Sequence, residues 1–492
     1  MQAPWGRGAQ RVAAGERPGA FVVVSIDALS CLSLQKTFDP VLSTRHMAPL
    51  TRRQLLQQTV TGGGVLALAG CLSAPRGSRN TTEGAPATDD TIPAGTWPQI
   101  GYDSQHTRHI PDARGPRNDA TIAWQSLGDR PVYPPVVDDA LYCTEGWTDG
   151  TAFALASEDG TQQWSTSDLP PMRWAPALHD DRLLVITRAE GNVVRLHALD
   201  TASGDQVWVQ EEGITASSGE HPPISPTVHG DSVYIGSNRG IIVCDVTTGD
   251  LNWTATLGPH VVETENGPTW RTDWAKPAVT ADRVFTFDMN DSYRATRKMY
   301  AVNRRTGDRD WTAELDVGDG WYLKAHVVVG ADRVFVAALK PHVSAVMDDS
   351  PWSGSERLFA LDAASGEVAW DWKLPKKSLS PPAYADGTLY VGEWYPDADT
   401  GRLHALDVSD GSRTWTYESD VGAVLSPTVA GDTVYLSQGT ELAAVARADG
   451  TRRWQLELGA RIGPPVVVGE TAYIQTNPGH NDDSQLLAVH EP

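Results

Sequence analysis

Lysine, cysteine and long apolar runs are all scarce in this sequence, and each shortage excludes a class of protein. Only 8 of the 40 basic residues are lysine, and 62 acidic residues bring the net charge to −22. A chain of this charge repels nucleic acid, so we expect no nucleic-acid partner. The apolar runs near the N-terminus, at residues 21–34 and within the stretch 54–73, are shorter than the roughly 20 residues of a membrane-spanning helix, which excludes a spanning segment there.

The four cysteines form no adjacent pair and no metal-binding spacing. Cys31 and Cys71 precede the body of the chain, whereas Cys143 and Cys244 lie in strand-like apolar runs. We expect buried free thiols at these two positions, and one disulfide between distant repeats is the alternative. The sequence also lacks the nucleophile elbow, the phosphate-binding loop, the dinucleotide fingerprint and the zinc-protease motif.

The acidic surface is rich in aspartate, which outnumbers glutamate 43 to 19. Together with the shortage of lysine, this composition resembles that of proteins from salt-loving archaea, in which dense carboxylates keep the protein hydrated. A moderately acidic secreted protein is the alternative. Charge of this kind reports on solvent and solubility, and it says nothing about a reaction.

An export signal is predicted over residues 47–71. Arg52 and Arg53 precede an apolar stretch that ends in Leu-Ala-Gly followed by Cys71. This order resembles a twin-arginine signal joined to a lipobox, whose cysteine carries the lipid after cleavage. The resemblance implies a protein held by Cys71 on the extracellular face of the cytoplasmic membrane. An uncleaved signal anchor is the alternative, although the apolar run is too short to span.

The flanks of this signal define the other segments. Residues 1–46 are predicted to be a non-native or disordered extension, because Met47 is a plausible start. Residues 72–96 are small and polar and predict a disordered tether. Residues 97–492 remain as the folded domain.

A repeat of about 45 residues occupies that domain, and each copy ends in tryptophan. The closing tryptophans are Trp124, Trp164, Trp208, Trp253, Trp311, Trp370, Trp415 and Trp454. A glycine stands four residues before every one of them except Trp124, and an aspartate that can close an Asx turn often precedes it. Alternating apolar residues in each copy predict four short antiparallel strands. Sheets of this size bury both faces by stacking around an axis, which predicts a β-propeller.

The two ends of the domain complement each other. The last copy stops after three strands, and residues 121–124 form an outer strand that has no preceding three. We therefore expect an all-β, eight-bladed propeller that closes by pairing the N-terminal strand with the C-terminal blade, which also shields two sheet edges.

The motif Ala-Leu-Asp, then glycine, then tryptophan resembles the PQQ-type β-propeller repeat over residues 97–492. The resemblance implies one of two branches. Quinoprotein dehydrogenases hold pyrroloquinoline quinone and calcium on the axis beneath a ring of adjacent cysteines. Scaffold lipoproteins similar to the outer-membrane assembly factor carry no such group. Because this chain has no Cys-Cys pair, we expect no catalytic residue and no resident cofactor or metal, with the quinone and calcium as the alternative.

One cluster is a candidate ligand pocket. Aligning the inner strands six residues before the turn acid gives one residue per blade that should face the central channel: Tyr133, Ala175, Ser225, Lys276, His326, Ser380, Ser426 and Pro464. Most of these residues are small, but Lys276 and His326, in adjacent blades, are exceptions. Together with Lys324 they predict a basic pocket that binds a sugar or an anion, with Trp270 and Trp274 as its walls. The alternative is that Lys276 and His326 pair with Glu263, Glu265 or Asp273.

His106 and His109 could bind a metal on a helix, but a loop before the propeller is favoured. The sequence as a whole predicts a membrane-anchored, non-catalytic scaffold for cell-surface protein partners. A quinone-dependent oxidoreductase and a solute-binding protein are the alternatives.

Overall fold

The computed structural model describes residues 92–127, 135–146, 149–172, 174–188, 193–211, 225–237, 240–257, 261–264, 267–270, 272–290, 297–317, 321–341, 354–374, 378–394, 400–421, 424–476 and 484–492. They belong to one compact unit, Thr81–Pro492. The predicted export signal with Arg52, Arg53 and Cys71 lies outside the described residues, as does most of the predicted tether. Within the described residues, no helix has the length and hydrophobicity needed to span a membrane.

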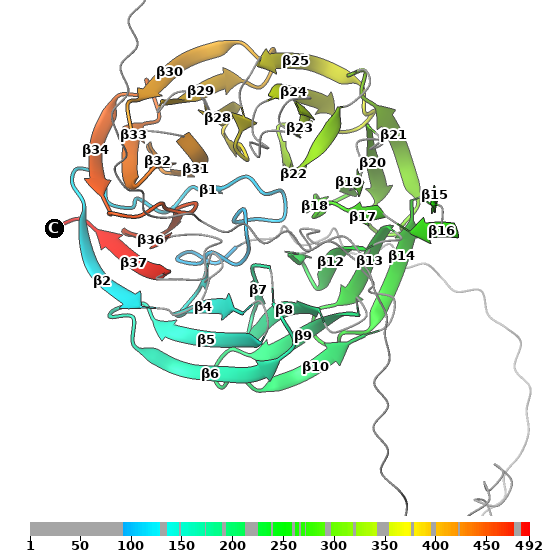
Figure 1. The fold of residues 1–492 in the computed structure, drawn as a ribbon, viewed down its shortest axis with the longest axis horizontal. Helices are drawn as coiled ribbons and strands as arrows, with labels where there is room; N and C mark the ends of the chain where they lie inside the picture. Colours follow the sequence, from blue (N-terminus) through cyan, green and yellow to red (C-terminus); the bar gives the residue numbers. More distant parts are fainter. Residues whose placement is uncertain are drawn as a thin grey trace, which may run out of the picture. The chain divides into compact units, whose positions relative to one another are not determined.

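Eight antiparallel sheets stand around a central axis, which confirms the predicted eight-bladed β-propeller (Figure 1). The strands of each blade are given from the inner to the outer one. Blade 1 comprises β3 (Val136–Val137), β4 (Ala140–Glu145), β5 (Gly150–Ala156) and β6 (Gln162–Leu169), and blade 2 comprises β7 (Ala177–His179), β8 (Arg182–Arg188), β9 (Val194–Asp200) and β10 (Gln206–Gln210). Blade 3 comprises β11 (Thr227–His229), β12 (Ser232–Ser237), β13 (Gly240–Asp245) and β14 (Leu251–Thr256), and blade 4 comprises β18 (Ala278–Val279), β19 (Arg283–Asn290), β20 (Lys298–Asn303) and β21 (Arg309–Glu314), with β17 (Thr272–Trp274) also paired to β19.

Blades 5 to 8 follow the same order. Blade 5 comprises β22 (Tyr322–Gly330), β23 (Arg333–Pro341), β24 (Gly354–Asp362) and β25 (Val368–Leu374), and blade 6 comprises β27 (Ala383–Ala385), β28 (Thr388–Trp394), β29 (Gly401–Asp407) and β30 (Arg413–Ser419), with β26 (Ser378–Leu379) also paired to β28. Blade 7 comprises β31 (Val424–Ala430), β32 (Thr433–Gln438), β33 (Glu441–Ala446) and β34 (Arg452–Glu457), with β1 (His109–Ile110) parallel to β31. Blade 8 comprises β35 (Val466–Val468), β36 (Thr471–Gln475), β37 (Gln485–His490) and β2 (Thr121–Leu127). A separate hairpin consists of β15 (Val261–Thr264) and β16 (Gly267–Trp270).

The closing tryptophan joins each blade to the next. In blade 6, Trp415 packs against Tyr390 with ring centroids 5.8 Å apart, and its Nε1 donates to the Arg447 carbonyl of blade 7 at 3.1 Å. Gly450, at φ 74°, lies under the same ring, where a Cβ would come within 2.6 Å of it. The repeated glycine thus accommodates the tryptophan of the preceding blade.

The ring closes in blade 8, where β2 pairs antiparallel with β37 as predicted. The turn that would join β37 to its outer strand is replaced by the two ends of the domain. Asn118 Nδ2 donates to the Glu491 carboxylate at 2.6 Å, and Trp454 Nε1 donates to the Pro116 carbonyl at 2.8 Å. The N-terminal residues therefore stand where a continuous turn stands in the other blades.

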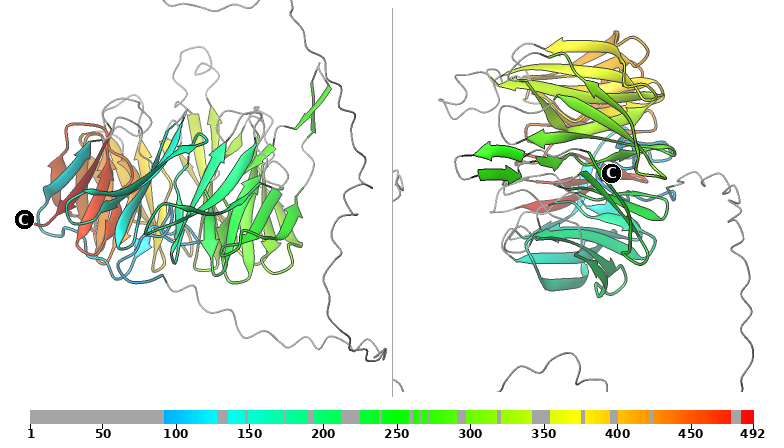
Figure 2. Two further views of the ribbon diagram at one scale, coloured as in Figure 1. Left: turned by 90° about the horizontal axis from the view of Figure 1, so that it is seen from below. Right: turned by 90° about the vertical axis from the view of Figure 1, so that its right-hand side faces the viewer.

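Residues 96–115, here called the axial segment, contact every blade in turn. Each contact lies beside the turn that links the inner strand to the second strand, so these turns define one face of the ring, the turn face. The hydrogen bonds run between Trp97 and Val137, Pro98 and Leu178, Gln99 and Val228, Ser104 and Val279, Gln105 and Val329, Thr107 and Tyr384, Arg108 and Val429, and from Arg114 and Gly115 to Gly469. Figure 2 shows the hairpin β15–β16 projecting from the opposite face, here called the hairpin face.

Candidate functional site

Of the predicted pocket residues, the structure describes the side chain of Lys276 alone. Lys276 precedes β18, is 7% exposed, and donates from Nζ to the Ile100 carbonyl of the axial segment at 2.8 Å. The side chains of the other four, Trp270, Trp274, Lys324 and His326, lie outside the described residues, as do those of Glu263, Glu265 and Asp273. The pocket stays a prediction, and the described partner of Lys276 is a backbone carbonyl on the axis.

Lys276 belongs to a buried polar group, here called the axial cluster, that also contains Asp103 and Arg108. Burial raises the pKa of Asp103 to about 6, although Thr107 donates to the carboxylate from both its backbone nitrogen, at 2.8 Å, and its hydroxyl. Burial lowers the pKa of Arg108 to about 10, and its Nε donates to the Pro427 carbonyl at 2.9 Å. The cluster ties the axial segment to blades 4 and 7.

Burial also holds the pKa of Lys276 well below its usual value. Asp103 opposes this shift by attraction, and Arg108 adds to it by repulsion. Sequence reasoning identified Lys276 as a residue facing the axis, but it missed Asp103 and Arg108. A signal was present in Trp97 and Tyr102, because two large aromatic side chains close to the predicted tether indicate a segment that is buried.

The histidines of the axial segment serve different blades. His106 has a φ of 62°, and its Nδ1 lies 2.9 Å from the Val327 carbonyl while Nε2 lies 3.3 Å from Thr227 Oγ1. His109 lies in β1 against blade 7, where burial lowers its pKa. The two histidines are not on a helix, and no group of three or more potential metal ligands occurs among the described residues.

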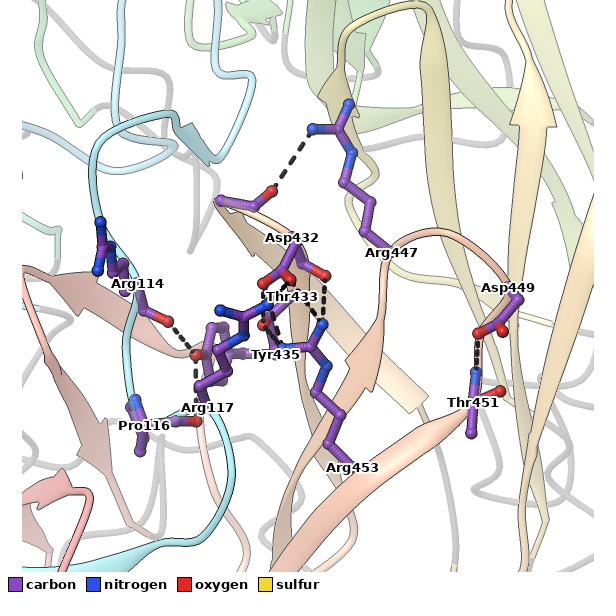
Figure 3. Close-up of polar contacts among 11 residues, drawn as sticks. Arg114, Pro116, Arg117, Asp432, Thr433, Tyr435, Arg447, Asp449, Thr451 and Arg453 are labelled. Atoms are coloured by element: carbon purple, nitrogen blue, oxygen red, sulfur yellow. Dashed lines mark hydrogen bonds and ion pairs between the residues drawn. The ribbon is translucent and has the colours of Figure 1, made fainter.

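A groove of about 440 Å³ lies between blades 6 and 7. Its lining includes Tyr390, Trp415, Asp432 and Arg447. Arg447 donates to the Tyr390 hydroxyl at 3.1 Å and to Asp386 at 2.8 Å. Figure 3 shows that Arg117 and Arg453 converge on Asp432. Beside them, the Tyr435 hydroxyl donates to the Arg114 carbonyl at 2.7 Å and lies 3.2 Å from the Pro116 carbonyl. These polar groups join the axial segment and neighbouring blades to one another.

Cys143 and Cys244 are buried and free, as predicted. They lie on different blades, in β4 and β13. Burial raises the pKa of both thiols, that of Cys244 to about 12. They do not form the ring of adjacent cysteines that the resemblance to quinoprotein dehydrogenases would require.

Comparison with known proteins settles the family. The family described as "Outer membrane protein assembly factor BamB" matches residues 113–291 and 295–489. The chain belongs to this family of PQQ-type propeller repeats. BamB from Moraxella catarrhalis shares 15% identity with it at a TM-score of 0.50, covering 75% of this chain and 97% of that one.

Two further similarities concern enzymes. A europium-containing methanol dehydrogenase shares 14% identity at a TM-score of 0.60, covering 80% of this chain and 98% of that one. The quinohemoprotein alcohol dehydrogenase of Comamonas testosteroni shares 16% sequence identity at a TM-score of 0.56, covering 80% of each chain. At these identities the likeness shows the fold.

The serine/threonine-protein kinase AfsK of Streptomyces coelicolor is 25% identical over 123 residues, which are 25% of this chain and 14% of that protein. This chain therefore spans a small part of the kinase's length.

Proposed function

We propose that this protein is an exported, lipid-anchored propeller that acts as a non-catalytic binding or assembly scaffold at the cell surface. The observation that carries the proposal is the path of the axial segment, which follows the predicted tether and is hydrogen-bonded to all eight blades on the turn face. The chain would then pass from an anchor at Cys71 through the tether into the folded domain at the axial segment. Membership of a family described by an assembly factor supports the same role.

The alternative is a quinone-dependent oxidoreductase, which the fold of the methanol and alcohol dehydrogenases favours. A third candidate is a sugar or anion binder at the predicted pocket, and it depends on Lys276. That side chain already donates to Ile100. This engagement favours the scaffold, because Lys276 contributes to holding the axial segment in the ring.

Quinone binding separates the two main candidates. The full chain, in high salt, is titrated with pyrroloquinoline quinone and calcium while tryptophan fluorescence and dye-linked dehydrogenase activity are recorded. A scaffold leaves both signals flat. Saturable quenching together with oxidation of an alcohol or sugar would overturn the proposal.

Anchoring is tested separately by membrane fractionation of cells that express the full chain. Cys71→Ala is expected to move the protein from the membrane to the soluble fraction while the ring stays folded. Replacement of both Arg52 and Arg53 by lysine is expected to block export. Retention of the Cys71→Ala variant in the membrane fraction would contradict the anchor.

A further inference from the structure

The rim of the propeller is made of outer strands whose outward edges differ in charge. In blades 4 to 7, every outer strand carries charged residues, namely Arg309, Asp310, Glu314, Asp371, Lys373, Arg413, Glu418, Arg452, Arg453 and Glu457. By contrast, β2, β10 and β14 carry none. Charge on an edge strand discourages pairing with another chain, so blades 8, 2 and 3 lack this protection.

Strand β10 is the most apolar of the three uncharged edges. Val207 is 45% exposed and Val209 is 39% exposed. Among the described side chains, the exposed large apolar residue is Ile122 in β2 and Leu251 in β14. Every outer strand shares a bulge just before its tryptophan, so the bulge does not set β10 apart. What distinguishes β10 is a pair of exposed valines on an uncharged strand.

The polar side chains of β10 are engaged within the ring. Gln206 Oε1 lies 2.8 Å from His197 Nδ1 on β9, and Gln210 Nε2 donates to the Gly249 carbonyl at 2.9 Å. Because both glutamines bond within the ring, the valines between them are the main side chains that β10 offers to a neighbour. Figure 1 places β10 on the outer rim of the ring.

The sequence of β10, Gln-Val-Trp-Val-Gln, reads the same in both directions. In an antiparallel pair of two such strands, a twofold axis at Trp208 sets Val207 opposite Val209 of the second copy and each Gln206 opposite a Gln210. Within β10, each apolar residue then meets an apolar residue, and no charge faces a charge. Just beyond the strand, Asp205 faces Glu211 of the second copy, where Arg195 pairs with Glu211 at 2.7 Å and offsets part of the repulsion.

We propose that two copies of this chain associate through their β10 edges, joining the two second blades into one continuous sheet. The occupant of this edge is thus a second copy, because the strand complements itself in side-chain type and in its lack of charge. Two strands of five residues bury less surface than a standard interface, so the dimer is weak and depends on concentration.

Sedimentation equilibrium of the full chain over a wide concentration range tests the proposal. We expect the mass to rise toward twice that of the monomer, and we expect Val207→Lys with Val209→Lys to raise the dissociation constant at least about tenfold. Val368→Lys is the matched control, because Val368 is also 45% exposed but lies on the charged strand β25. A natural protein that stays monomeric at every concentration would overturn the proposal. So would a control variant, Val368→Lys, that raises the dissociation constant as much as the double variant does.

Cysteine cross-linking tests the register. Val207→Cys and Val209→Cys are made in separate chains in which Cys31 and Cys71 are replaced by serine, and the native Cys143 and Cys244 stay silent because they are buried. Mixing the two variants under oxidation is expected to yield at least about tenfold more disulfide-linked dimer than either variant alone. Equal yields from the mixture and the single variants would show that Val207 does not face Val209, and the twofold pairing would be wrong.

Discussion

At the scale of single residues, the interface between blades depends on a tryptophan and the glycine beneath it. Trp164 Nε1 donates to the Thr201 carbonyl of the next blade at 2.7 Å. Trp208 occupies the equivalent position, but its buried Nε1 has no acceptor among the described residues. The same residue type therefore contributes differently in neighbouring blades.

Substituting these two tryptophans measures the difference. Trp164→Phe loses a hydrogen bond and leaves a carbonyl less satisfied, whereas Trp208→Phe removes a donor that has no acceptor in the described part of the chain. We expect Trp164→Phe to lower the free energy of unfolding by about 1 kcal/mol more than Trp208→Phe does. Urea denaturation of both variants checks this, and equal losses would contradict it.

Gly450 provides a second residue-scale prediction. Alanine at Gly450 would suffer both the strain of a φ of 74° and a clash with Trp415, while alanine at Gly459 would suffer only the strain of a φ of 73° because nothing lies within 4 Å. We expect Gly459→Ala to cost about 1 kcal/mol and Gly450→Ala to cost about 1 to 3 kcal/mol more. Thermal unfolding of the two variants measures the difference. Equal unfolding midpoints would show that the Trp415 ring can shift to accommodate the new Cβ without a loss of stability.

At the scale of the element, the axial segment is an irregular stretch whose hydrogen bonds reach all eight blades. The bonds come from backbone groups in seven blades and from the Gln99 side chain in blade 3. Its buried charges make its contribution dependent on pH. The pKa of Asp103 is raised from 3.8 to about 6, so the folded protein retains a proton that the unfolded chain releases between these values. This group therefore stabilises the fold less as the pH rises from about 4 to 6.

Asp103→Asn removes that titration. We expect the variant to gain stability relative to the natural protein as the pH rises from about 4 to 6, by at most about 3 kcal/mol. Asp449→Asn should show its effect at lower pH, because hydrogen bonds from Thr451 lower the pKa of Asp449 below 3.8. The stability that Asp449 contributes is lost as the pH falls below about 4, and the variant lacks this loss. Unfolding free energies measured from about pH 2 to 6 check both effects, and parallel curves for Asp103→Asn and the natural protein between about pH 4 and 6 would contradict the first.

At the scale of the whole molecule, the ring depends on a closure that joins the two ends of the domain. Strand β2 has its described partner in β37, and Glu491 holds Asn118 beside it. Loss of β37 would leave the outer strand without a sheet and would expose the edges of blade 8.

Truncation tests this closure. Removing residues 485–492 is expected to abolish the cooperative unfolding transition and to increase the radius of gyration measured by small-angle X-ray scattering. Removing residues 491–492 alone keeps β37 and should leave the unfolding transition cooperative, because the Glu491 contacts are exposed and contribute little. A compact, cooperatively unfolding protein after the longer truncation would show that closure is dispensable.

The sequence by itself determined the strands, the number of blades and the pairing that closes the ring. These follow from features that repeat locally, such as apolar alternation, turn aspartates and the spacing of tryptophans. The tertiary structure revealed what lies across blades, including the contact between Gly450 and the tryptophan of the blade before it.

The site was only partly predictable, because its contacts join residues that are far apart in the sequence. Lys276 was identified because it breaks a pattern of small residues at the axis, but its partner, the Ile100 carbonyl, lies 176 residues away in the chain. Every residue has a backbone carbonyl, so no residue type in the sequence marks the one that accepts from Lys276. For the same reason, no sequence pattern marks a segment that hydrogen-bonds to successive blades through its backbone. The tertiary structure alone decided where the axial segment lies, because that path depends on which backbone groups the closed ring leaves available.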